Sequence, residues 1–152
     1  MNKNIHVLSR AVILDHDHIL LCKTLDLAQS FYFLPGGHVE HGESAESAVL
    51  RELFEESSAL CSIKRFLGCL EYSFEPGRNS ICHNHEYNFI FEAVSDTLKI
   101  ANDIPQLEDH IKLVWIPTLK LSDIDFRAEP LRLLVPKWLA RSEDYAFQSV
   151  ML

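Results

Sequence analysis

The segment from residue 44 to residue 57 constrains the fold most, because it reads as one amphipathic helix with an unusual charge pattern. Ser44 is a suitable N-cap, and the helix is predicted over residues 45–57. At about 100° per residue, four apolar residues share a face that we expect to pack on the core: Val49, Leu50, Leu53 and Phe54. A neighbouring face carries three carboxylates beside two small side chains that leave room around them: Glu52, Glu55 and Glu56, with Ala45 and Ala48.

These carboxylates have few basic neighbours. A solvent-exposed helix face normally pairs glutamate with lysine four residues further on, but no lysine occurs between residues 24 and 63. Arg51 alone cannot neutralise three carboxylates. Clustered carboxylates without basic partners suit hard divalent cations such as Mg²⁺ or Mn²⁺. A solvated acidic face is the alternative interpretation, and the absence of lysine favours a metal site.

The rest of the chain mixes strands and helices. Apolar, β-branched segments predict strands over five ranges: residues 5–14, 18–23, 61–74, 87–94 and 112–116. A short apolar run, residues 31–34, ends at Pro35-Gly36-Gly37. A second helix is predicted over residues 129–139, with a kink at Pro136. Because strands and helices do not alternate strictly, we expect an α/β fold of the α+β type, in which helices pack on a mixed β-sheet.

The bulk properties narrow the class of protein. A length of 152 residues predicts one domain over residues 1–152. The net charge of −8 argues against binding to a nucleic acid polymer, although a bound cation would let an acidic protein hold a phosphate-bearing small molecule. The sequence has no apolar stretch of membrane-spanning length, no export signal and no C-x-x-C pair. We therefore expect a cytoplasmic protein with reduced thiols and no membrane contact.

The acidic helix and the loop before it resemble a known motif. Gly37, five residues, Glu43, seven residues and then the hexapeptide 51–56 (Arg-Glu-Leu-Phe-Glu-Glu) resemble the Nudix box of the Nudix hydrolases. Two positions depart from it, since Ser58 replaces a glycine and Ala59 replaces a bulkier aliphatic residue. Glycine there suits a left-handed helix terminus, so serine would cost about 1 kcal/mol if that backbone conformation is kept. The resemblance implies a Nudix-like α/β/α sandwich.

The resemblance also implies an activity and a set of site residues. Family members hydrolyse a pyrophosphate bond in a nucleoside diphosphate linked to a second group, as in nucleotide sugars such as ADP-ribose, nucleoside triphosphates and dinucleoside polyphosphates. The residues implied to hold Mg²⁺ or Mn²⁺ are Glu52, Glu55 and Glu56, with the Gly37 carbonyl as a further ligand. Glu52 or Glu55 would accept the proton of the attacking water, and Arg51 would pair with Glu43 to hold the loop against the helix. Some members recruit a glutamate from a later loop, for which Glu108 is the candidate.

The sequence offers two candidate phosphate contacts and more than one possible function. Lys23 and Arg78 could each contact a phosphate or simply face solvent. Glu129-Pro130 resembles a stretch of members that remove oxidised nucleotides, but those have asparagine where this chain has Ala128, which disfavours that substrate. A non-catalytic nucleotide-binding sensor is the main alternative, and the retained carboxylates argue against it. An isoprenoid diphosphate isomerase is a third reading, for which the chain shows no extra catalytic residues. A homodimer is common for such domains, although the sequence identifies no interface.

Overall fold

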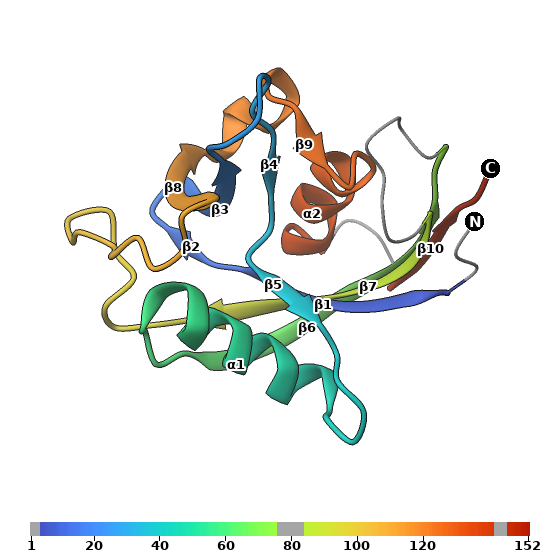
Figure 1. Ribbon diagram of the computed structural model, residues 1–152, viewed down its shortest axis with the longest axis horizontal. Coiled ribbons are helices and arrows are strands. Elements are labelled where there is room, and N and C mark those ends of the chain that lie inside the picture. The colour runs from blue at the N-terminus through green and yellow to red at the C-terminus, as the bar shows by residue number, and fades with distance from the viewer. Residues whose placement is uncertain (1–3, 76–83, 142–145) are drawn as a thin grey trace.

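The computed structural model describes residues 4–75, 84–141 and 146–152. Its strands form two mixed sheets (Figure 1). The first sheet has the order β10 (Phe147–Val150), β6 (Ser62–Ser73), β7 (His85–Val94), β1 (His6–Val12) and β5 (Gly36–His38). The second has the order β2 (Leu14–Asp15), β3 (His18–Thr24), β4 (Tyr32–Phe33) and β9 (Phe126–Arg127), with β8 (Ile111–Pro117) paired to β3. The mixed α+β class predicted from the sequence is confirmed.

Two helices cover opposite sides of the first sheet. Helix α1 (Ala45–Ser57) packs on β1 and β5, whereas α2 (Leu131–Leu139) lies on the other side against β6 and β9 (Figure 1). A 3₁₀ helix, Thr118–Asp123, leads from β8 towards β9. In the part of the chain that the structure describes, no helix is long and apolar enough to span a membrane.

The buried apolar side chains form two clusters, one on each side of the first sheet. One cluster joins α1 to both sheets and includes Val49, Leu53 and Phe91. The other joins α2 to both sheets and includes Ile90, Val135 and Trp138. Strand alternation explains the division, because successive residues of β1 and β7 point to opposite faces of the sheet. The carboxylate helix is thereby fixed against the edge of the sheet that β5 forms.

The predicted helix 45–57 is confirmed at both ends, but its orientation differs from the expected one. The buried arc includes Glu56 and Ala48, which were predicted to lie on a separate acidic face. Phe54, predicted to face the core, is 52% exposed. It lies about 160° around the helix from Glu56. The helix therefore turns one edge of its acidic face towards the protein, and Ala48 packs there instead of leaving open space.

The other differences concern short elements. Helix α2 begins two residues later than predicted, because Pro130 acts as its N-cap residue, and Pro136 lies within it. Strands β5, β9 and β10 were not predicted. Each is four residues or shorter, and each is held by pairing with a strand that is distant in sequence, namely β1, β4 and β6. Local sequence patterns do not report such pairing.

Candidate active site

The glycine loop and the acidic helix meet at Gly37. Strand β5 pairs with β1 in antiparallel register, with Gly37 opposite Ser9, and the Ser9 hydroxyl donates a hydrogen bond to the Ala45 carbonyl at 2.6 Å. These contacts draw the first turn of α1 onto the sheet edge. A Cβ atom built on Gly37 would lie 2.5 Å from the Glu52 carboxyl carbon. The structure thus brings together Gly37 and Glu52, and it allows no side chain between them.

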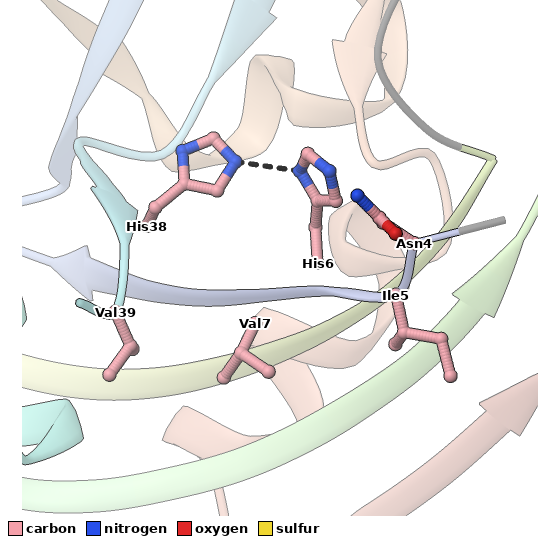
Figure 2. A pocket seen from close by; sticks show the side chains of 6 residues that line it. All are labelled: Asn4, Ile5, His6, Val7, His38 and Val39. Carbon is pink, nitrogen blue, oxygen red and sulfur yellow. Dashed lines mark hydrogen bonds between the residues drawn. The ribbon is translucent and has the colours of Figure 1, made fainter. Parts of the chain in front are cut away.

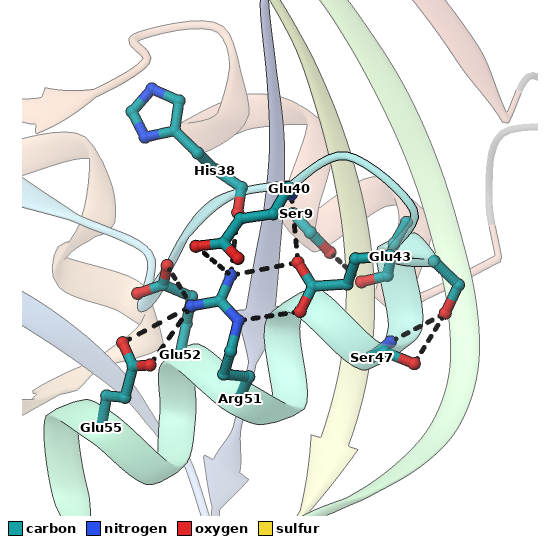
Figure 3. Close-up of polar contacts among 10 residues, drawn as sticks. Ser9, His38, Glu40, Glu43, Ser47, Arg51, Glu52 and Glu55 are labelled. Carbon is teal, nitrogen blue, oxygen red and sulfur yellow. Dashed lines mark hydrogen bonds and ion pairs between the residues drawn. The ribbon is translucent and has the colours of Figure 1, made fainter.

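Arg51 is the centre of an ion-pair network (Figure 3). Its guanidinium binds Glu43 through two parallel hydrogen bonds, from Nε at 2.8 Å and from Nη2 at 3.1 Å. Nη1 donates to Glu52 at 3.0 Å and to Glu55 at 3.4 Å, and Nη2 also donates to the His38 carbonyl at 3.1 Å. The predicted Arg51–Glu43 pair is present, and Arg51 joins the helix to the loop.

The charges of this network reinforce one another. The hydrogen bond from Arg51 holds the pKa of the Glu43 carboxyl below its usual range, and the Glu40 backbone N–H adds to the effect. The same contact with Glu43 raises the pKa of Arg51, with Glu52 and Glu55 contributing further. Both groups therefore stay ionised at neutral pH, and the loop remains tied to the helix.

Glu56 occupies a different environment from the other two carboxylates. Its side chain is 7% exposed, and it accepts hydrogen bonds from the Gly36 backbone N–H at 3.4 Å and from the Cys22 thiol at 3.7 Å. Among the described residues, no basic group forms an ion pair with it. Burial raises its pKa to about 8, against the attraction of Arg10. Glu56 is thus a buried carboxyl group that forms no ion pair in the described part of the chain, although Arg10 attracts it from a longer distance.

The remaining predicted residues lie at different distances from this centre. Glu108 is close enough for its charge to raise the pKa of Glu56, and its carboxylate lies 3.2 Å from the His110 ring. Lys23, at the end of β3, lies over the Tyr32 ring with its Nζ 5.8 Å from the ring centroid. Arg78 lies outside the described residues.

Three further residues adjoin the site that the sequence patterns did not single out as functional. Arg10 and Cys22 both act on Glu56, as described above. His6 lies in an open pocket of about 380 Å³, where its Nδ1 is 2.8 Å from Nε2 of His38 (Figure 2). The local signal for Arg10 is that it is the one arginine or lysine within β1. Cys22 and His6 carry no comparable signal, because their roles depend on pairing between distant strands.

The donor set fits a hard divalent cation, although the side chains are not gathered around one point. Among the described residues, no group of three His, Cys, Asp or Glu side chains is already arranged to hold a metal ion. Glu52 and Glu55 point towards Arg51 instead (Figure 3). Glu56, however, is buried and forms no ion pair within the described residues, and all three side chains offer carboxyl oxygens, which when ionised are ligands of the kind that Mg²⁺ and Mn²⁺ prefer.

Comparison with known proteins agrees with this geometry. The NUDIX domain family model matches residues 5–137. An ADP-ribose pyrophosphatase of Methanocaldococcus jannaschii is 33% identical over 94 residues, which are 62% of this chain and 54% of that protein. The chain therefore spans about half the length of this curated relative.

Solved structures show the same fold. A MutT protein from Methanosarcina mazei Go1 superposes with a TM-score of 0.71 at 19% identity, over 95% of this chain and 99% of that one. A NUDIX hydrolase from Nitrosomonas europaea gives a TM-score of 0.70 at 21% identity, over 94% and 93% of the two chains. With the family model matched over most of its length, the chain belongs to the NUDIX domain family.

Proposed function

We propose that this protein hydrolyses the pyrophosphate bond of a nucleoside diphosphate linked to a second group, in a reaction that depends on Mg²⁺ or Mn²⁺. The observation that carries the proposal is the junction at Gly37, where Glu52 lies against the glycine backbone and Glu56, one turn further along α1, is buried with no ion pair to any described residue. ADP-ribose is the first substrate to test, because the curated relative is named for it.

The carboxylates of α1 take the roles that their positions allow. Glu52, Glu55 and Glu56 would hold the cation, with the Gly37 carbonyl and Glu108 as further candidate ligands. When bound, the cation neutralises charge on the pyrophosphate and lowers the pKa of a water molecule. Whichever of Glu52 and Glu55 does not bind the cation would accept the proton of the attacking water, because a carboxylate within hydrogen-bond reach is a suitable general base. Glu55 has the more exposed side chain, 53% against 20% for Glu52.

Arg51 and Glu43 support these groups without acting on the substrate. Their bidentate pair and the bond from Arg51 to the His38 carbonyl keep the loop in register with the helix. Nη1 of Arg51 donates to both Glu52 and Glu55, so its positive charge reduces the repulsion between these two carboxylates. Lys23 is a candidate phosphate contact, because its ammonium lies at the end of β3 on the face that carries Tyr32.

A substrate panel tests the proposal. The wild-type protein is incubated with ADP-ribose, other nucleotide sugars, nucleoside triphosphates and dinucleoside polyphosphates, with Mg²⁺, with Mn²⁺ or with EDTA, and release of nucleoside monophosphate is measured. We expect metal-dependent release from at least one class. Tight nucleotide binding with no turnover on any member of the panel would instead favour the non-catalytic sensor.

A further inference from the structure

Arg10 is the one arginine or lysine within β1. Its side chain lies on one face of the first sheet, and its charge acts on Glu56 on the other face. Its side chain shares a strand face with Leu8 and Val12, which are both buried, whereas Ser9 points the other way and binds α1. Arg10 therefore belongs to the face opposite the acidic helix. Arg10 and Glu56 nevertheless interact electrostatically, at the point where β5 consists of Gly36 and Gly37 and carries no side chain.

Backbone contacts fix the guanidinium of Arg10 in place. Its Nη1 donates to the Leu34 carbonyl at 3.2 Å and to the Gly36 carbonyl at 3.1 Å. Its Cζ lies 5.4 Å from the centroid of the Phe33 ring, which covers one side of the planar group. A guanidinium held by three neighbours along one segment of chain has lost most of its freedom before any ligand arrives.

The remaining donors of Arg10 are not used by the described part of the protein. A guanidinium carries five N–H donors, and both of those on Nη1 are taken by the two carbonyls. Nε and Nη2 make no hydrogen bond, and no carboxylate forms an ion pair with Arg10, in the ranges that the structure describes. Arg51, in contrast, directs its donors to three carboxylates and a carbonyl. Arg10 thus lies within electrostatic reach of Glu56 without forming an ion pair in the described ranges, and its Nε and Nη2 donors stay available.

We propose that Arg10 binds the phosphate groups of the substrate, through Nε and Nη2, on the opposite side of the Gly36–Gly37 backbone from the carboxylates of α1. The planar fork of a guanidinium matches two oxygens of one phosphate. A pyrophosphate held there by one phosphate would reach across the glycines towards Glu52 and Glu56. This proposal rests on the proposed function, which supplies the substrate. It adds Arg10 as a phosphate contact beyond the two that the sequence suggested, Lys23 and Arg78.

Two measurements test whether Arg10 binds phosphate. They are made on four proteins: the wild type, Arg10→Gln, Arg10→Lys and the control Arg132→Gln. Arg132 lies at the start of α2, where it pairs with Glu129. The first measurement is KM and kcat for ADP-ribose with Mg²⁺. The second is the Kd of α,β-methylene-ADP with Mg²⁺ by titration calorimetry, which does not require turnover. Thermal unfolding of each protein is recorded alongside.

For Arg10→Gln we expect both KM and Kd to rise roughly 10- to 100-fold, the range of a lost hydrogen bond to a charged group. Arg10→Lys, which keeps the charge without the fork, is expected to lie between Arg10→Gln and the wild type, and Arg132→Gln to match the wild type. If the wild type does not hydrolyse ADP-ribose, the Kd series still decides the role of Arg10.

The contrary result is a Kd for Arg10→Gln within about twofold of the wild type, whether or not its unfolding temperature falls. That result would mean that Arg10 only holds the backbone of residues 34–36 in place and does not bind phosphate. If Arg10→Gln does not fold, an unchanged Kd for Arg10→Lys overturns the proposal in the same way. Failure of the wild type to bind α,β-methylene-ADP at all would also overturn it.

Discussion

Gly37 is the residue at which the candidate site has least room. The chain at this position has an ordinary backbone conformation, so the glycine is required by the carboxyl group of Glu52 and not by its φ angle. Any larger residue must displace that carboxyl group. Gly42, only five residues away, has a φ of +82°, and a Cβ atom built on it would have no atom within 4 Å. The two glycines therefore separate a steric requirement from a conformational one.

This contrast predicts that Gly37→Ala lowers activity, whereas Gly42→Ala lowers stability. Gly37→Ala is expected to lower kcat/KM on the order of 10²-fold, because a displacement of about 1 Å in a positioning group has an effect of that size. Its stability should change little, since Glu52 is a flexible side chain. Gly42→Ala is expected to lower stability while its turnover stays near that of the wild type. Steady-state kinetics and denaturant unfolding on both variants check this, and equal turnover in the two would contradict it.

Ser58 shows that the departure from the Nudix box leaves the shape of the helix end unchanged. It adopts a left-handed conformation with φ of 59° and ψ of 11°, and its backbone N–H donates to the Phe54 carbonyl. Ala59, the second departure, is buried in the cluster beside α1. The expected geometry is therefore kept, at the cost that a residue with a Cβ pays there.

Replacement of Ser58 by glycine is accordingly predicted to stabilise the protein by about 1 kcal/mol. Ser58→Ala is the matched control, because it removes the hydroxyl but keeps the Cβ, and its stability should stay near that of the wild type. Urea unfolding measures both. A Ser58→Gly protein no more stable than Ser58→Ala would show that the left-handed residue is not strained.

At the scale of elements, a partly buried ion pair between β6 and β7 also ties the first sheet to α2. Glu92 on β7 accepts from Arg65 at 2.6 Å and from Lys64 at 3.1 Å, and Arg65 also donates to the Leu139 carbonyl at the end of α2. Burial raises the pKa of Glu92, but the two basic partners outweigh it, so its pKa lies below the ordinary value of 4.5. The carboxylate is stabilised in the folded state relative to the unfolded chain.

Glu92→Gln is predicted to lower the free energy of unfolding by about 2 kcal/mol at pH 7, below the usual range for a buried pair because Arg65 is partly exposed. A carboxyl whose pKa is depressed on folding contributes fully above its unfolded pKa, and the contribution fades as pH falls through the folded pKa. The difference from the wild type should therefore shrink below about pH 4.5. Urea unfolding from pH 7 to pH 3 checks this, with the exposed Asp96→Asn as control; a difference that stays constant over this range would contradict it.

The elements also show which parts of the fold are readable from local sequence. Helix α1 was predictable to the residue, because the Ser44 N-cap and the periodic apolar residues are local signals. The long strands were predictable within about two residues. Strand β5 was not, since Gly36–His38 reads as a loop and becomes a strand only by pairing with β1. The orientation of α1 was also missed at Phe54, because the helix is placed by the sheet edge and not by its apolar stripe alone.

At the scale of the whole molecule, the candidate site gathers residues from β1, β3, β5, α1 and the loop before β8. The box residues could be predicted because they lie within one segment of 20 residues, from Gly37 to Glu56. Arg10 and Cys22 could not, because only the pairing of distant strands places them beside Glu56. The motif therefore predicts the proposed chemistry but not the second group of the substrate.

The measurement that tests this account most directly is AMP release from ADP-ribose by the wild type and by Glu56→Gln, with Mg²⁺, with Mn²⁺ and with EDTA. Glutamine keeps the shape of the buried side chain and removes its charge. We predict AMP release by the wild type with a divalent cation, none with EDTA, and a loss on the order of 10³-fold in Glu56→Gln. Equal rates in the wild type and Glu56→Gln, or a rate that EDTA does not change, would contradict the account.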